Sequence, residues 1–382
     1  MTAGIRMKNP HLDATDPCWG FAFDGVTPDD CAWTNFLGTL AADGGIGILP
    51  IGASVVASAE ALAVTTSKQI ALRGAGPGLT KIRTSTAVDG LSITFTDSLQ
   101  PPILQDLCLQ TTALAAGTAL TINGPSEPWL ANLGPSVRGV RVRSEDAATQ
   151  CWLNGITFND CWYPSVAASE IKGLNQSYLP FSMKNGITYN NCQALRADHF
   201  TMFHLDTGIV QGGNVYGEGV QISHFEMVGV NAGVVTNGTP SIGTSIHDGH
   251  INAYSCGVKM LGHAGASIHD LLLFKCNLSS SDWIGVFLNQ SQDIVVHHIL
   301  AQGPGAVLAG SAVGVQLYQS NDNLIDAVST DQFGSPLAYS VIVGTGSSRN
   351  TVRGTKIGRT GGYPAYAPAI MSDAGPGNAI AA

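Results

Sequence analysis

The sequence predicts an all-β protein built as a single-stranded parallel β-helix, a solenoid of short stacked strands. The first indication is an internal repeat, because the segment 154–161 (NGITFNDC) returns at 185–192 (NGITYNNC) with six of eight positions identical. The second is composition: 46 glycines and 12% charged residues suit many tight turns, and 44% hydrophobic residues suffice for a core. A length of 382 residues also suits a fold that grows by stacking.

Weaker copies of the repeat continue downstream at irregular intervals of 22 to 35 residues. Aligned on one apolar anchor, the copies begin at Ile156, Ile187, Ile222, Ile246, Ile268, Ile294, Leu324 and Val352. The fifth position after the anchor is also apolar, at Cys161, Cys192, Met227, Ile251, Leu273 and Ile299. Helical repeats keep a stricter period and carry 3.6-residue stripes, which these segments lack. We therefore expect both positions to point inward, with each coil pairing its neighbours at a spacing of about 4.8 Å.

Two polar columns accompany the anchors. The first column, one residue after the anchor, holds Thr157, Thr188, Ser223, His247 and His269. The second column, four residues after the anchor, holds Asp160, Asn191, Glu226, His250, Leu272 and His298. Because successive side chains of a strand point to opposite faces, these columns are expected to line one exterior face.

The N-terminal region predicts a short helix followed by strands. Asp29 and Asp30 are N-cap candidates, and an apolar stripe follows at Trp33, Phe36, Leu37 and Leu40. Short strands are expected on both sides of LPIG at 49–52 and of RGAGPG at 73–78. The latter lacks the Lys-Ser/Thr of a phosphate loop, so we interpret it as a β-turn.

This order of elements resembles the start of the pectate-lyase-like superfamily of right-handed parallel β-helices. The matching residues are Asp24, Gly25, Asp29, Asp30, Gly44, Gly45, Leu49, Pro50, Gly52, Leu72, Gly74, Gly76, Thr80 and Ile82. The resemblance implies that the helix caps the open end of the β-helix and that these residues are structural. It gives the expected organisation as a lead-in at 1–22, a β-helix at 23–360 with its cap at 23–45, and a C-terminal tail or cap at 361–382.

Within that superfamily, the chain is most similar in style to bacteriophage tailspikes and capsular depolymerases. The resemblance implies an endo-acting enzyme on bacterial surface polysaccharide (capsule, exopolysaccharide or lipopolysaccharide), a homotrimer, and a place in the virion tail or outside the cell. Because the cap begins within about 30 residues, we expect that the chain either docks onto a phage tail or baseplate protein or is truncated. The NTD and RIK motifs of polygalacturonases and the DPH motif of alginate epimerases are missing. We predict hydrolysis by a pair of carboxyl groups. A polysaccharide lyase acting on a uronate-containing glycan and a non-catalytic glycan-binding fibre or adhesin are the alternatives.

Glycoside hydrolysis needs two carboxyl groups. Because acidic residues are scarce in this chain, they can be ranked as catalytic candidates. Glu226 comes first, because it lies in the outward column beside His250 of the next coil. Asp206 and Glu218 are its nearest acidic neighbours in the polar segment 196–226. Asp248 is the fourth candidate; its alternative interpretation, shared with Asp270, is a turn aspartate that stabilises a corner.

The lyase alternative requires a base and a cation beside a uronate carboxylate. Arg196 with His199 or Tyr216 could fill these roles. Sugar rings stack on aromatic side chains, and the candidates for such contacts are Trp152, Trp162, Tyr163, Tyr189, Tyr216 and Trp283. Some of these rings are expected in the core or at a trimer interface instead.

The remaining patterns argue against other functions. A net charge of −9 without a Lys/Arg cluster argues against nucleic-acid binding. The eight cysteines form no CxxC pair, and we interpret them as free thiols. We interpret the histidine column at 247 and 269 as an exposed stack. We therefore expect no metal and no cofactor. No apolar segment has the length and composition of a signal peptide or a membrane span, so membrane insertion is not expected.

Overall fold

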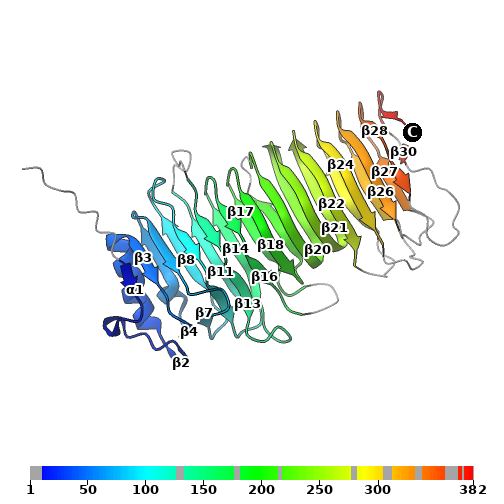
Figure 1. Cartoon of the computed structure of the whole chain (residues 1–382). Helices are drawn as coiled ribbons and strands as arrows, with labels where there is room; N and C mark the ends of the chain where they lie inside the picture. Colours follow the sequence, from blue (N-terminus) through cyan, green and yellow to red (C-terminus); the bar gives the residue numbers. More distant parts are fainter. Residues whose placement is uncertain are drawn as a thin grey trace, which may run out of the picture. The chain divides into compact units, whose positions relative to one another are not determined.

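The computed structural model describes residues 11–125, 133–175, 181–213, 217–276, 282–303, 312–331, 338–357, 369–371 and 374–381. The chain divides into two compact units, Met1–Leu174 and Asn175–Ala382, and each is a parallel β-solenoid (Figure 1). The fold class expected from the sequence, a right-handed parallel β-helix with a short N-terminal helix, is confirmed.

The first unit forms three parallel ladders. They run β1–β3–β6–β9–β12–β15, β2–β4–β7–β10–β13–β16 and β5–β8–β11–β14. The strands are β1 (His11–Asp13), β2 (Asp24–Pro28), β3 (Gly45–Ile48), β4 (Gly52–Val56), β5 (Ala63–Thr66), β6 (Ile70–Arg73), β7 (Thr80–Thr84), β8 (Leu91–Phe95), β9 (Ile103–Gln105), β10 (Cys108–Thr111), β11 (Ala116–Asn123), β12 (Ser136–Arg138), β13 (Arg141–Ser144), β14 (Trp152–Asn159), β15 (Ser165–Ala167) and β16 (Glu170–Lys172). Two 3₁₀ turns, Pro17–Trp19 and Ala59–Leu62, join them. Strict alternation of buried and half-buried residues in β7 and β8 shows the period-2 pattern that selects strand.

The helix α1 (Asp30–Asp43) buries the predicted apolar stripe, including Trp33. Its acidic N-terminus does not cap the helix as expected, since the Asp29 side chain makes no capping hydrogen bond. Asp29 instead accepts a hydrogen bond from Ser54 Oγ at 2.6 Å, and Asp30 accepts one from the Ser58 backbone N–H at 2.7 Å. The two carboxylates therefore fasten the helix to the segment around β4.

The second unit carries two long parallel ladders in its described part. One runs β17–β19–β20–β21–β23–β25–β27–β30, and the other runs β18–β20–β21–β22–β24–β26–β28–β31. The strands are β17 (Asn185–Asn190), β18 (Arg196–Phe203), β19 (Thr207–Gly212), β20 (Gln221–Ile242), β21 (Ser245–Ala264), β22 (Ser267–Lys275), β23 (Trp283–Asn289), β24 (Val295–Gln302), β25 (Ala312–Tyr318), β26 (Leu324–Asp331), β27 (Ala338–Val343), β28 (Thr351–Arg353), β29 (Lys356–Ile357), β30 (Ala369–Met371) and β31 (Ala379–Ile380). β20 and β21 are long enough to contribute to both ladders.

The register corrects the alignment of the sequence repeats. Ile187 pairs with Ile209 in the first ladder, whereas Ile222 pairs with Ile246 in the second. The anchor series therefore switches between two faces of the coil. Further along, the partner of Ile268 is Val296, two residues after the expected Ile294, and Val296 pairs with Ile325, one residue after the expected Leu324. Both faces of the coil alternate buried and outward residues in the same way, and the coils differ in length. The spacing of apolar residues alone therefore does not determine which residues of neighbouring coils pair.

The interior otherwise follows the prediction. All six residues of the fifth-position column, from Cys161 to Ile299, are at most 1% exposed. All eight cysteines lie in the described residues and are thiols outside any disulfide; Cys18 and Cys31 are exposed and the others are buried or half-buried. Strands on both sides of the segment expected to form the β-helix, 23–360, also join the sheet. β1 pairs with β3, and β31 pairs with β28.

A buried polar ladder runs through the C-terminal coils. Asn323 Nδ2 donates to Asn350 Oδ1 at 2.9 Å, and Asn350 Nδ2 donates to Asn378 Oδ1 at 2.9 Å. Asn350 also donates to the Ser320 carbonyl at 2.8 Å. Each amide thus satisfies backbone and side-chain groups of neighbouring coils, which a buried polar group requires. Within the described ranges, none of the helices has both the length and the apolar character needed to cross a bilayer.

Candidate functional site

One outward face of the second unit concentrates histidine and aspartate. The register aligns Asp198, Ser223, His247, His269 and His297 on β18, β20, β21, β22 and β24. The residue that follows each of these is His199, His224, Asp248, Asp270 or His298. We call these ten residues the histidine–aspartate ridge. It holds six of the ten histidines of the chain, and every member is exposed or half-buried. The strands that carry it lie side by side in Figure 1.

The ridge follows a corner of the coil. The second residue of each pair has a positive φ, between 48° at His224 and 53° at Asp248 and Asp270. Non-glycine residues rarely adopt this region, and Asn, Asp and His are the enriched exceptions. Histidine and aspartate at the corner therefore suit its left-handed backbone conformation. The side chains of each pair face solvent.

Each aspartate of the ridge orients an imidazole. His199 Nδ1 lies 2.7 Å from Asp198 Oδ2, and His247 Nδ1 lies 2.8 Å from Asp248 Oδ2. The same contact joins His269 and Asp270 at 2.7 Å.

Further contacts cross between coils. The Nδ1 atom of His224 lies 2.9 Å from Asp198 Oδ1, and its Nε2 atom lies 3.8 Å from Asp248 Oδ2. His298 Nδ1 lies 3.3 Å from Asp270 Oδ1. The ridge is therefore a connected network of ionisable groups over several coils.

Five of the six imidazole rings of the ridge stack along the coils, in two separate groups, because His224 and His247 meet edge to face. Ring centroids are 4.6 Å apart for His199 and His224, and 4.9 Å apart for His247 and His269. His269 and His297 follow at 4.7 Å. These separations match the coil spacing of about 4.8 Å, so the stacking is a direct product of the parallel register.

Hydrogen bonding sets the electrostatics of the ridge. Desolvation opposes ionisation of Asp198, yet hydrogen bonds from His199, Ser223 and His224 hold the pKa of Asp198 at about 2. The hydrogen bond from His269 lowers the pKa of Asp270. Desolvation and the neighbouring imidazoles lower the pKa of His297. At neutral pH the ridge thus presents fixed carboxylates among imidazoles.

The predicted neighbours Glu226 and His250 do meet. They pair in register on β20 and β21, with His250 Nδ1 3.7 Å from Glu226 Oε1. Asp248 lies two residues before His250, on the same coil. One coil step of about 4.8 Å and two residues of strand place the backbones of Glu226 and Asp248 no more than about 8 Å apart. The structure therefore brings three predicted site residues to adjacent coils.

The other predicted acids lie elsewhere around the coil. Glu218 precedes β20, where its backbone carbonyl accepts a hydrogen bond from the Ala194 N–H at 2.6 Å. Asp206 precedes β19, and Asn231 Nδ2 donates to it at 3.2 Å. Neither position shares the short stretch of β20 that carries Glu226. Sequence proximity within 196–226 therefore does not amount to spatial pairing.

The lyase candidates are partly on the ridge. Arg196 is exposed at the start of β18, two residues before Asp198 and on the same outward side of the strand. His199 is a ridge member bonded to Asp198. Tyr216 lies outside the described residues.

Three of the aromatic side chains expected to contact sugars are buried. Tyr189 is 1% exposed and Trp283 is 0% exposed, so neither ring offers a face to a sugar. Tyr189 occupies an inward position of β17, as Phe158 does in β14, and the repeat simply places an aromatic in the core. Trp152 is likewise buried. Trp162, in the first unit, is half-buried with its ring centroid 6.2 Å from that of Tyr163.

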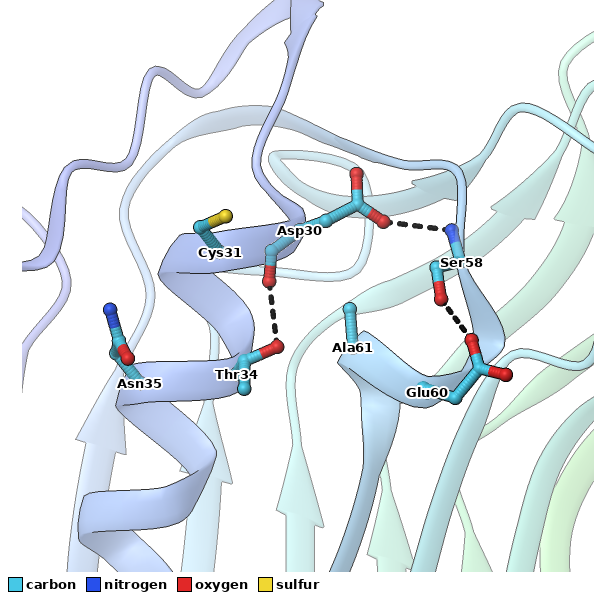
Figure 2. Close-up of a pocket in the computed structure, with 7 residues that line it drawn as sticks. All are labelled: Asp30, Cys31, Thr34, Asn35, Ser58, Glu60 and Ala61. Carbon is cyan, nitrogen blue, oxygen red and sulfur yellow. Dashed lines mark hydrogen bonds between the residues drawn. The ribbon is translucent and has the colours of Figure 1, made fainter.

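A hollow beside α1 is a separate feature (Figure 2). Its lining residues are Asp30, Cys31, Thr34, Asn35, Ser58, Glu60 and Ala61. The acidic groups there are already engaged, because Asp30 accepts from the Ser58 N–H and Glu60 accepts from Ser58 Oγ. The contact of Asp30 fastens the helix α1 to the turn after β4, and we do not assign the hollow a function.

Sequence reasoning missed Asp198, His224 and His297 as members of one site. A signal was present, since the dipeptides DH, SH, HD, HD and HH begin at 198, 223, 247, 269 and 297. Their recurrence becomes informative only with the correct register, which depends on the ladder described above.

Comparison with known proteins gives a likeness of fold. No protein-family model matches the sequence, and no curated protein matches it. Among solved structures, DFA-IIIase from Arthrobacter chlorophenolicus A6 in complex with GF2 is 13% identical with a TM-score of 0.52, over 92% of this chain and 84% of that one. The Dettilon tailspike protein is 12% identical with a TM-score of 0.48, over 91% of this chain and 68% of that one. The N-terminal fragment of bacteriophage Phi29 gene product 12 is 11% identical with a TM-score of 0.48, over 90% and 66%.

Proposed function

We propose that this chain is an endo-acting enzyme that hydrolyses a bacterial surface polysaccharide, with the histidine–aspartate ridge and Glu226 as its glycan-binding and catalytic face. The observation that carries the proposal is the placement of Glu226, Asp248 and His250 on adjacent coils of one exposed face. A row of polar side chains that continues over several coils suits an extended polymer. Carboxylates and imidazoles there supply acceptors and donors for sugar hydroxyl groups.

Glu226 and Asp248 are the proposed carboxyl pair. Their backbones lie no more than about 8 Å apart, so both carboxyl groups can face one glycosidic bond, as glycoside hydrolysis requires. We assign Glu226 as the acid that protonates the leaving oxygen. Asp248 is assigned as the base that orients water, because His247 occupies its Oδ2 at 2.8 Å and leaves Oδ1 as an acceptor.

His250 and the ridge histidines are the proposed positioning groups. His250 lies 3.7 Å from Glu226 and is close enough to hold its carboxyl group in place. His199 and Arg196, on β18, extend the binding face to the neighbouring coils. Trp162 stays a candidate sugar contact, while Asp206 and Glu218 stay secondary acid candidates.

The proposed setting is a phage tail. Its support is the resemblance of residues 24–82 and the irregular coils to tailspikes and capsular depolymerases. From that resemblance we propose a homotrimer, placed in the virion tail or outside the cell and attached to a tail or baseplate protein. The likeness to DFA-IIIase supports the view that this fold accommodates an enzyme.

A uronate lyase is the second candidate. Arg196 favours it, because an exposed cation two residues from the Asp198–His199 pair could neutralise a substrate carboxylate beside an imidazole base. A non-catalytic glycan-binding fibre is the alternative without chemistry.

The test is incubation of the purified protein with a panel of capsular polysaccharides, exopolysaccharides and lipopolysaccharides. New reducing ends alone are expected for the hydrolase. Reducing ends together with the ultraviolet absorbance of an unsaturated uronate would instead identify a lyase. Binding to a host-matched glycan without either signal would identify the fibre and overturn the proposed enzyme.

A further inference from the structure

We propose that Asp198, His199 and His224 form a site for one divalent transition-metal ion, with Zn²⁺ as the best match. One donor atom from each of the three side chains lies within 4.8 Å of the other two. Among the residues that the structure describes, no other group of three meets this distance limit. The site lies within the proposed glycan-binding face, but the metal proposal does not depend on hydrolysis, and it departs from the expectation of no metal drawn from the sequence.

The Asp198 carboxylate is the centre of the arrangement. His199 Nδ1 lies 2.7 Å from its Oδ2, and His224 Nδ1 lies 2.9 Å from its Oδ1. The two imidazoles therefore present the same ring nitrogen to the same carboxylate, and their rings are nearly parallel at 16°. Bonds from zinc to nitrogen and oxygen are about 2.0–2.2 Å long, so tetrahedral ligand atoms lie about 3.4 Å apart. Small side-chain rotations reach this geometry, with the ion replacing the protons on the two Nδ1 atoms.

Neighbouring groups already support the ligands. Ser223 Oγ donates to Asp198 Oδ1 at 2.8 Å and fixes the carboxylate. Asp248 Oδ2 lies 3.8 Å from His224 Nε2, on the side of the ring opposite Asp198. A ligating imidazole commonly places its second nitrogen against a carboxylate, which orients the ring and raises its basicity. The surroundings of His224 thus resemble a carboxylate–histidine–metal arrangement.

The donor set selects the class of metal. Two imidazole nitrogens with one carboxylate oxygen suit zinc, copper or nickel, whereas Ca²⁺ and Mg²⁺ prefer oxygen ligands. The side chains of His199 and His224 are 66% and 50% exposed. Remaining coordination positions are therefore open to water or to an oxygen atom of a molecule on the ridge.

The test is isothermal titration of protein without a polyhistidine tag, using Zn²⁺ and, separately, Ca²⁺. We expect one Zn²⁺ per chain and no measurable Ca²⁺ binding. His224→Ala and His199→Ala should each weaken Zn²⁺ binding by about tenfold or more, since even outer-shell changes cost about that much. The matched control is His269→Ala, which removes a stacked ridge imidazole outside the three-residue site and should keep the wild-type affinity.

Co²⁺ provides a second readout, because imidazole ligation gives it visible absorption bands that His224→Ala should remove. Unchanged Zn²⁺ binding in both His199→Ala and His224→Ala would overturn the site. So would an equal loss in His269→Ala, which would indicate diffuse binding along the ridge. Circular dichroism establishes that each variant is folded, and the exposure of His199 makes its removal structurally mild. No glycan is needed, so failure of the metal site is distinguishable from failure of the proposed hydrolysis.

Discussion

His250 lies beside Glu226 on the neighbouring coil, with its Nδ1 atom 3.7 Å from Glu226 Oε1. The contact arises from the register, which pairs the two residues directly across β20 and β21. Both side chains are partly open to solvent, so the pair is available to a ligand and contributes little to folding stability. Its consequence is therefore expected in activity.

Glu226→Gln should abolish glycan cleavage while leaving the fold intact. The amide keeps the shape of the side chain but has no acidic proton to donate, and general acid catalysis contributes roughly 10²–10⁴-fold. The measurement is the rate of formation of reducing ends on a glycan that the wild type cleaves. Asp322→Asn is the matched control, since Asp322 is a carboxylate paired across coils with Arg349, away from the ridge. Full activity of Glu226→Gln would remove Glu226 from the proposed pair.

Asp248→Asn should lower the rate by a similar factor, roughly 10²-fold or more, because the variant lacks the base that activates water. Because Asp248 is assigned as a base for water and not as a nucleophile, we further predict inversion at the cleaved carbon. Nuclear magnetic resonance of the first product formed reads its anomeric configuration directly. A retained configuration would contradict the role assigned to Asp248 even if both variants were inactive.

Asn350→Ala should destabilise the C-terminal coils. Asn350 is fully buried. Its removal takes a donor from the Ser320 carbonyl and an acceptor from both the backbone N–H and the side-chain amide of Asn323. Each unsatisfied buried group costs about 1–3 kcal/mol in the free energy of unfolding. Hydrogen exchange should show faster opening around β26 and β28, while the strands of the first unit keep their protection. Asn35→Ala, on the exposed side of α1, is the control and should change neither.

The protein should lose folding stability in mild acid because of the buried residue His263. It is 1% exposed, its Nε2 lies 3.0 Å from Thr244 Oγ1, and burial lowers its pKa to about 4. Between pH 6.5 and 4 the unfolded chain binds a proton that the folded chain does not, so the free energy of unfolding falls as pH falls. The full effect is about 3 kcal/mol. Urea unfolding of His263→Gln should show a flatter pH dependence in this window, and an unchanged slope would exclude His263 as the cause.

The parts of the fold that the sequence predicts are those that local patterns determine. The helical spacing of the apolar residues around Trp33 and Phe36 predicts their burial, and the alternation of strand residues predicts the inward isoleucines. The pairing of Glu226 with His250 was also predicted correctly, because the anchors Ile222 and Ile246 belong to the same ladder.

The parts that the sequence does not predict depend on register between coils of unequal length. Asp198 and His224 are 26 residues apart, and their contact exists only because β18 and β20 align without a shift at that point. The error of two residues at Ile294 places His298 in the column of Glu226 and His250. The structure instead has Leu300 in that column, His297 in the column of His269, and His298 at the corner. Tyr189 and Trp283 are buried because they occupy inward positions of their strands, which the presence of an aromatic residue in the sequence does not reveal.

Gly249→Ala tests whether the packing beneath the site positions it. A Cβ atom at Gly249 would lie 2.2 Å from Cζ of Phe225, whose ring is stacked on Phe200 at 5.5 Å and is 5% exposed. The ring has little room to move, so we expect a loss of roughly 1–3 kcal/mol in the free energy of unfolding.

Activity should fall along with stability in Gly249→Ala, because Glu226 directly follows Phe225 and Asp248 directly precedes Gly249. Gly38→Ala is the matched control: nothing lies within 4 Å of a Cβ at this exposed helical position, and alanine favours helix by up to about 1 kcal/mol. Thermal unfolding and cleavage rates measured below the transition separate the two effects. Wild-type activity in a clearly destabilised Gly249→Ala would show that the Phe225 stack supports the fold without positioning Glu226 and Asp248.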